Sequence, residues 1–141
     1  MELFILGCIL LLCSGTAVVL LGRFRVASWI ATLGVWAGCG LALIPVIQTL
    51  GGHCPEPLRL AWSIPGGSLT LGLDGLSAFF CLPILLISPL AALYGCEYLA
   101  HEKKSLGSVL FFCNVLIASM LLLMTAWNGL LFLVVWEIMA V

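Results

Sequence analysis

One ionisable side chain, Glu137, stands in a stretch of the chain that should otherwise lie in lipid. The last fifteen residues read WNGLLFLVVWEIMAV, and this carboxylate alone interrupts the apolar run that follows Asn128. Carboxylates inside a membrane span are costly, and they usually face a bundle interior or a wet cavity and mark ion paths or proton relays. Because lipid favours the neutral form of a carboxyl group, Glu137 could hold a proton and exchange it with a nearby Lys or a water chain. A protonated Glu that only hydrogen-bonds a neighbouring helix is the alternative.

The depth of Glu137 favours the relay. The residue lies nine positions after Asn128, which at about 1.5 Å per residue is roughly 13–14 Å along a helix. Half of a hydrocarbon core about 30 Å thick is about 15 Å. With Asn128 at the end of the span, Glu137 is therefore expected close to the bilayer midplane.

The other residues able to do chemistry favour structural roles. The seven cysteines show no C-x-x-C spacing, and most of them stand in apolar runs, where Cys acts as a small hydrophobe. We therefore expect no metal, iron–sulfur cluster or other cofactor in this chain. Asp74 is expected to cap a helix by accepting backbone N–H bonds. Asn114 and Gln48 are expected to hydrogen-bond between helices.

The composition places these residues in a membrane protein. Of the 141 residues, 64% are hydrophobic and 8% are charged, whereas about a quarter are charged in soluble domains. The net charge of −1 gives no basis for nucleic-acid binding. The apolar runs are continuous and about 20 residues long, which predicts helices and not a β-barrel. Glu2 stands where a signal peptide would be basic, so we expect a retained first span.

These runs predict an all-α integral membrane fold of about five transmembrane helices. The expected spans cover residues 3–21, 26–50, 76–94, 106–124 and 129–141, the fifth being truncated. Pro45, Pro83 and Pro89 should bend or end the regular helix. Gly34 and Gly38 have a spacing that lets two helices approach closely. A hydrophilic loop is expected over residues 97–105.

Residues 51–73, between the second and third spans, are rich in Pro and Gly and should lie outside the membrane. Polar and apolar residues alternate over residues 58–62 and 68–71, and the PGG of residues 65–67 is a turn signal. This pattern favours a short extracytoplasmic β-hairpin over an irregular loop.

The basic residues predict the orientation. Four of the five fall in the connections after the first and third spans, which the positive-inside rule makes cytoplasmic. They are Arg23, Arg25, Lys103 and Lys104. The N-terminus is then extracytoplasmic.

Two stretches resemble a known family. LGLDGLSAFF (residues 71–80) looks like the start of the third span in the antiporter-like membrane subunits of respiratory complex I and its relatives. FFCNVLIASMLLLMTAWNGLLFLVVWEIMAV (residues 111–141) resembles their fourth span, short turn and fifth span. The longer PGGSLTLGLDGLSAFF (residues 65–80) is most similar to the large membrane subunit of group 4 nickel–iron hydrogenases, the formate hydrogenlyase and hydrogenase-4 type. Subunits of NADH–quinone oxidoreductase and of multisubunit Na⁺/H⁺ antiporters are similar alternatives.

The resemblance implies a place in a redox-driven complex of the bacterial inner membrane. Glu137 matches the family's fifth-span glutamate, which is held to be central to proton translocation together with a Lys on a later span. Redox chemistry would occur on other subunits, so the chain would be an oxidoreductase subunit without a redox-active site of its own. Its partners would be the lipid bilayer and other membrane subunits. The family's subunits are several times longer, so the chain is expected to match about their first third, as a truncated product or a partial sequence.

Two other readings stay open. The chain would be a small structural scaffold or assembly protein, with Glu137 protonated and bonded, or a non-functional remnant of a transporter. The residues also leave open whether the ion is H⁺ or Na⁺, and which electron donor and acceptor the complex uses.

Overall fold

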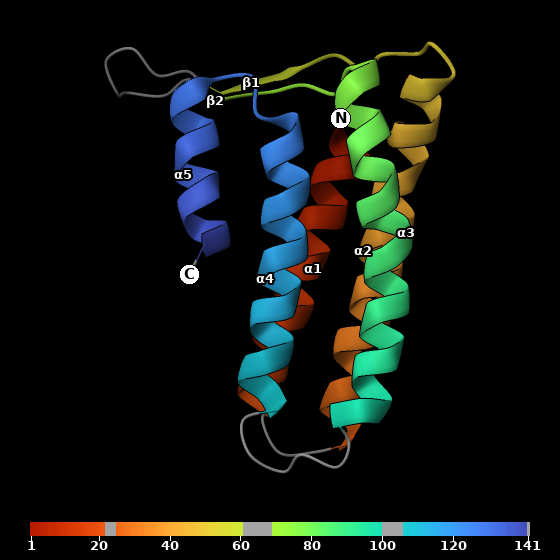
Figure 1. The fold of residues 1–141 in the computed structure, drawn as a ribbon, viewed down its shortest axis with the longest axis vertical. Helices are drawn as coiled ribbons and strands as arrows, with labels where there is room; N and C mark the ends of the chain where they lie inside the picture. Colours follow the sequence, from red (N-terminus) through yellow and green to blue (C-terminus); the bar gives the residue numbers. More distant parts are fainter. Residues whose placement is uncertain (22–24, 61–68, 100–105, 141) are drawn as a thin grey trace.

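The computed structural model describes residues 1–21, 25–60, 69–99 and 106–140. Within these residues the chain forms an upright bundle of helices, with two short strands lying across one end (Figure 1). We call this the strand end of the bundle. The elements in chain order are α1 (Glu2–Leu21), α2 (Arg25–Leu50), β1 (Leu58–Leu60), β2 (Leu69–Leu71), α3 (Gly75–Leu99), α4 (Leu106–Thr125) and α5 (Gly129–Ala140).

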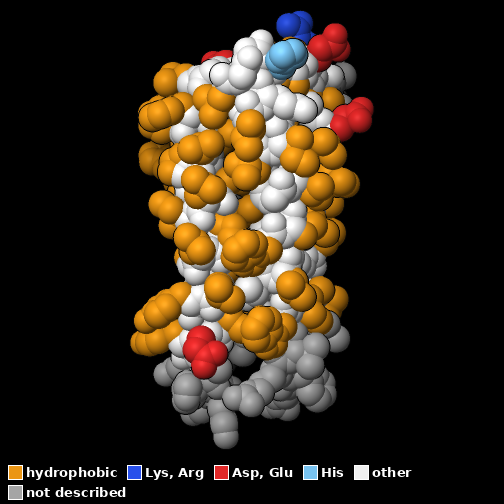
Figure 2. Space-filling view, turned by 90° about the vertical axis from the view of Figure 1, so that its right-hand side faces the viewer, with side chains coloured by type: hydrophobic (Ala, Val, Ile, Leu, Met, Phe, Trp, Pro, Cys, Tyr) orange, Lys and Arg blue, Asp and Glu red, His pale blue; other side chains and the backbone are white. Residues whose placement is uncertain are grey.

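The helices confirm the expected all-α class. α1 to α4 are each long and apolar enough to cross a membrane, whereas α5 has 12 residues. Large apolar side chains cover the outside of the bundle, among them Leu33, Phe79 and Ile87. On the face shown in Figure 2, charged side chains lie toward the two ends and apolar ones between them. A helix that is apolar all round is typical of a membrane span.

Successive long helices run in opposite directions, and α1 lies between α2 and α4 (Figure 1). α3 packs mainly against α2. The core between them is formed by buried apolar side chains, which include Phe4, Leu11, Val35, Val46 and Leu121. The bundle is therefore tightest around α1 and α2 and more open between α3 and α4.

A buried hydrogen bond joins α1 and α4. Asn114 donates through Nδ2 to Ser14 Oγ over 3.0 Å, and both residues are buried. This confirms the interhelical role expected of Asn114, since a buried amide needs a partner. The same role stays a prediction for Gln48, which is exposed near the strand end and makes no side-chain hydrogen bond to a described residue.

α3 runs further than its apolar pattern predicts, and α2 continues through a proline that was expected to bend or end it. α2 continues through Pro45, and α3 continues through Pro83 and Pro89 as far as Leu99. Glu97 therefore lies on the helix and not in the expected loop. Apolarity marks the part of a helix in lipid, whereas the backbone hydrogen bonds continue into the polar interface. The expected loop residues 100–105 lie outside the described residues.

β1 and β2 pair antiparallel, with Arg59 opposite Thr70. They occupy the positions where alternation favoured a hairpin over an irregular loop. The expected turn at residues 65–67 lies outside the described residues, as do Arg23, Lys103 and Lys104 in the basic connections.

α1 and α2 approach closely at glycines. A Cβ added to Gly38 would lie 2.9 Å from the carbonyl oxygen of Gly7 and 2.8 Å from Leu11 Cγ. A Cβ on Gly34 would overlap the side chain of Ser14. The face of α2 that carries Gly34 and Gly38 therefore packs against α1 of the same chain.

This contact predicts a size limit at Gly38. Gly38→Ala should lower the unfolding free energy by about 1–3 kcal/mol, because the added methyl group pushes two backbones apart. Gly40→Ala is the matched control, since a Cβ there meets nothing within 4 Å and Ala favours a helix over Gly. Thermal unfolding in detergent measures both variants. Equal melting temperatures for the two would contradict the close approach.

Candidate functional site

α5 begins at a well-defined cap. Asn128 Oδ1 accepts the backbone N–H of Leu130 over 2.9 Å and that of Leu131 over 3.4 Å. The carbonyl of Asn128 accepts the N–H of Phe132 over 2.9 Å. The side chain therefore satisfies N–H groups that the first turn of a helix leaves without partners. Asn128 sets the starting point from which the depth of every α5 residue is counted.

One face of α5 packs against the bundle. Leu131 and Val135 are buried against Leu123 of α4 and Leu71 of β2, and Met139 packs partly against the same cluster. These α5 positions are four residues apart, which places them on one face of a helix. α5 therefore lies along α4 with a single apolar seam.

Glu137 lies on the opposite face of α5. It follows Val135 by two residues, which is about 200° around a helix of 3.6 residues per turn. Glu137 is exposed, and its neighbours Trp136 and Ile138 are 49% and 50% exposed. We call this side the distal face of α5. The sequence predicted a bundle interior or a wet cavity around the carboxyl group, and the described residues provide neither on this face.

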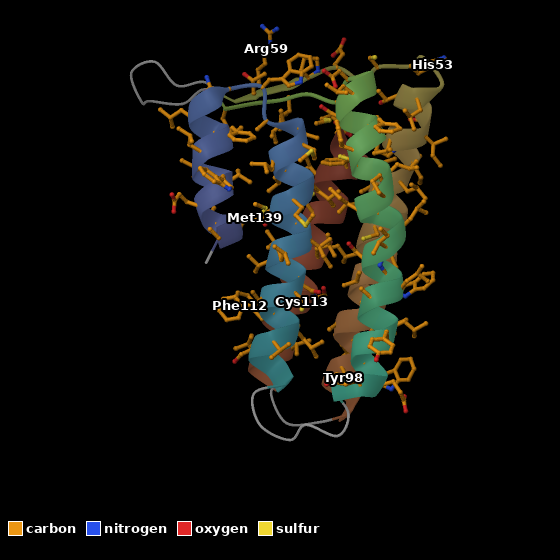
Figure 3. The ribbon with its side chains drawn as sticks, viewed as in Figure 1. His53, Arg59, Tyr98, Phe112, Cys113 and Met139 are labelled. Carbon is orange, nitrogen blue, oxygen red and sulfur yellow. The ribbon has the colours of Figure 1, made fainter. Side chains whose placement is uncertain are left out.

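The position of Glu137 along α5 can be compared with the length of the neighbouring helix α4. α5 runs from the strand end and stops about half-way along α4 (Figure 1). Met139, two residues after Glu137, lies at this level in Figure 3. The carboxyl group therefore lies well inside the apolar length of the neighbouring span.

The described part of the chain provides no partner for this carboxyl group. Glu137 makes no hydrogen bond or ion pair with any described residue. Arg59 and His53 lie at the strand end (Figure 3), and Lys103 and Lys104 are outside the described residues. A group that exchanges a proton with Glu137 would have to approach the distal face from elsewhere.

Asp74 lies at the start of α3. Its Oδ1 accepts the backbone N–H of Ser77 over 2.7 Å, and its carbonyl accepts the N–H of Ala78 over 2.8 Å. This is the geometry of a helix N-cap. The hydrogen bonds from Ser77 to the carboxylate hold the pKa of Asp74 below its ordinary value of 3.8, because they favour the charged form.

A contact that sequence reasoning missed joins β2 to the α4–α5 connection. Ala126 forms an antiparallel bridge with Leu71. The N–H of Gly72 donates to the carbonyl of Thr125 over 2.9 Å, and the N–H of Trp127 donates to the carbonyl of Thr70 over 3.0 Å. We call this contact of residues 70–72 with residues 125–127 the β2 clamp. The only sequence signal for it is the short connection of residues 126–128, which contains Trp127.

A cavity of about 390 Å³ lies between α2, α3 and α4. Its lining is mostly aliphatic, with Thr32, Ser88, Cys113 and Asn114 as polar members, and it includes no charged side chain. Such a lining offers nothing that titrates readily near neutral pH. Among the described residues, no three His, Cys, Asp or Glu side chains gather as metal ligands would.

No protein-family model matches this chain. The chain is 31% identical over 122 residues to hydrogenase-4 component B of Escherichia coli (strain K12). The chain is a homologue of this hydrogenase-4 subunit. The expected kinship with complex I-like hydrogenase membrane subunits is confirmed by this match and by the four apolar helices. On the same grounds the chain is a multi-pass membrane protein.

The match covers 86% of this chain and 18% of hydrogenase-4 component B. The share of the relative is smaller than the third that the resemblance led us to expect. The chain therefore spans about a fifth of the relative's length, while most of the chain is included in the match.

The cap at Asp74 predicts a pH-dependent stability. Asp74→Ala should lower the unfolding free energy by about 1 kcal/mol at neutral pH, since it removes the acceptor for the first turn of α3. A carboxyl with a depressed pKa stabilises the fold above its unfolded value, and the effect is lost as the pH falls through the folded value. The difference between Asp74→Ala and the wild type should therefore shrink below about pH 3.8. Thermal unfolding followed by circular dichroism between pH 7 and pH 3 measures it.

Asp74→Asn is the matched control for this titration. Asn caps a helix about as well as Asp and does not ionise, so this variant should keep most of the stability and lose the pH dependence. A deficit in Asp74→Ala that stays constant down to pH 3 would contradict a role for the charged carboxylate.

Proposed function

We propose that this chain is the N-terminal part of a proton-translocating membrane subunit of a redox-driven complex of the membrane-bound hydrogenase kind. In this proposal Glu137 carries protons within the membrane. The observation that carries it is the position of Glu137, deep in the apolar zone and on the side of α5 turned away from α4. The homology to hydrogenase-4 component B supports the kind of complex.

The position of Glu137 carries a physical requirement. A carboxyl group near the middle of the bilayer is costly when it faces hydrocarbon, and such groups normally face protein or water. The distal face of α5 therefore should be covered by protein or by a hydrated path in the working complex. The family resemblance offers a Lys on a later span as the partner, and the distal face is where that partner would approach.

The chemistry required of Glu137 is proton exchange. In lipid-like surroundings the neutral carboxylic acid is favoured, and the approach of a cationic Lys favours the carboxylate. Moving a positive charge toward Glu137 would release its proton, and moving it away would draw a proton back. Electron transfer on other subunits would drive that movement, so this chain needs no redox centre of its own.

The orientation belongs to the same proposal. α1 ends, α2 begins, α3 ends and α4 begins at the end of the bundle opposite the strands (Figure 1). Three of the five Lys and Arg residues fall in the connections at that end, and a fourth, Arg25, is the first residue of α2. By the positive-inside rule this end is cytoplasmic. The N-terminus and the strand end then face the outside of the bacterial inner membrane, and α5 runs inward.

The test uses the complete subunit in its assembled complex. Glu137→Gln should lower redox-driven proton uptake into inverted membrane vesicles by about tenfold or more, because a positioned proton-transfer group typically contributes at least that much. Gln keeps the size and hydrogen-bonding capacity of Glu but cannot carry the proton. Fluorescence quenching of a ΔpH-sensitive dye measures the uptake, and complex assembly is followed on native gels.

Glu97→Gln is the matched control, since Glu97 is an exposed acid on the last turns of α3. It should leave proton uptake unchanged. Wild-type uptake in Glu137→Gln would rule out the relay, and loss of assembly with normal uptake per assembled complex would favour a scaffold. Redox-driven uptake of Na⁺ that persists in the presence of a protonophore would replace the proton with sodium as the transported ion.

A further inference from the structure

The β2 clamp connects the strand end of the bundle to the start of α5. β2 pairs with β1 on one side, and on the other side it contacts the α4–α5 connection through the Leu71–Ala126 bridge. Gly72 donates its N–H to the carbonyl of Thr125, the last residue of α4. That carbonyl would otherwise be one of the unpaired groups at a helix C-terminus. β1 and β2 therefore reach across the bundle and end directly above α4 and α5 (Figure 1).

A close side-chain contact accompanies these hydrogen bonds. The indole ring of Trp127 lies against Gly72, and a Cβ added to Gly72 would overlap ring atoms of Trp127. Gly72 is buried, while Trp127 is 51% exposed. Glycine is therefore needed at position 72, because any side chain there would overlap the indole ring of Trp127.

The connection between α4 and α5 is short, so the clamp controls where α5 starts. Three residues, 126–128, separate Thr125 from Gly129. Ala126 and Trp127 are held by β2, and Asn128 caps the helix. A slip of one residue in this connection would rotate α5 by about 100° and shift it by about 1.5 Å. Such a rotation would move Glu137 off the distal face.

The apolar seam of α5 specifies this rotation poorly. Leu131 and Val135 pack against Leu123 of α4, but lipid tails are as apolar as these side chains, so lipid competes with the seam. The hydrogen bonds and the Gly72–Trp127 contact are directional and lie at the end of the helix. They are therefore the features that define the rotation and depth of α5.

We infer that Gly72 and Trp127 are positioning residues that hold α5 in the register that places Glu137 on the distal face at mid-depth. This inference rests on the proposed function for its consequence in proton transfer. The register of α5 can be tested independently of whether Glu137 transfers protons.

The first test is a double-mutant cycle in the complete, assembled complex. Gly72→Ala should lower proton uptake by about tenfold, because small misplacement of a reacting group has large effects on rate, and it should shift the pH profile of uptake. In a Trp127→Ala background, Gly72→Ala should have no further effect, since the ring that the methyl group displaces is absent. Gly129→Ala is the matched control at the start of α5, where a Cβ meets nothing within 4 Å.

The second test measures the register of α5 directly. Ile138→Cys and Met139→Cys stand on different sides of α5, and residues 114–141 contain no native cysteine. Each variant is labelled with a membrane-soluble maleimide, and mass spectrometry of the α5 peptide gives the extent of labelling. The measured quantity is the ratio of the labelling of Ile138→Cys to that of Met139→Cys. Gly72→Ala should change this ratio at least about threefold, as expected for a rotation of about 100°, and Trp127→Ala in the same chain should return it to that of Trp127→Ala alone.

The outcomes separate the two proposals. An unchanged labelling ratio in Gly72→Ala, or effects of Gly72→Ala and Trp127→Ala that simply add, would overturn the positioning role. A changed ratio with uptake insensitive to both Gly72→Ala and Glu137→Gln would support the positioning role and overturn the relay. If Gly72→Ala fails to assemble, Trp127→Ala alone tests the contact, because it adds no atoms and should still change the ratio.

Discussion

The hydrocarbon interior of a membrane offers no partner to a backbone N–H or C=O group, and this protein is arranged around that constraint. Within the spans the helices satisfy it by themselves. At the strand end, where α4 stops and α5 starts, other groups are needed. Gly72 donates to the last carbonyl of α4, Thr70 accepts from Trp127, and Asn128 caps α5. β2 thus contacts both the end of α4 and the connection from which α5 begins.

α5 has two different sides. Its packed side is an ordinary apolar seam with α4, and its distal side carries an acid at a depth where lipid alone would be an unfavourable neighbour. Glu137 has no partner among the described residues, and under the proposed function another helix or water would supply one.

The rest of the bundle provides the rigid support for α5. Gly7 and Gly38 let α1 and α2 approach closely, and Asn114 joins α4 to α1 through Ser14. α4 is in this way tied to the tightest pair of helices, and α5 is positioned relative to α4. Directional contacts matter more here than apolar area, because lipid competes with every apolar seam.

Much of this was readable from the residues alone, because hydropathy and helical rise act locally. Apolar runs located the helices, and Asp74 stood at the start of a helix. The mid-depth position of Glu137 stays a prediction from Asn128 and the rise per residue. Contacts between residues far apart in the sequence could not be predicted, because no sequence pattern indicates which elements pack together. The tertiary structure alone decided that Gly34 and Gly38 face α1, that β2 holds the α4–α5 connection through Gly72 and Trp127, and that Glu137 points away from the bundle. The direction of Glu137 depends on which side of α5 meets α4, and a helix that is apolar on nearly every side does not encode that choice in its own sequence.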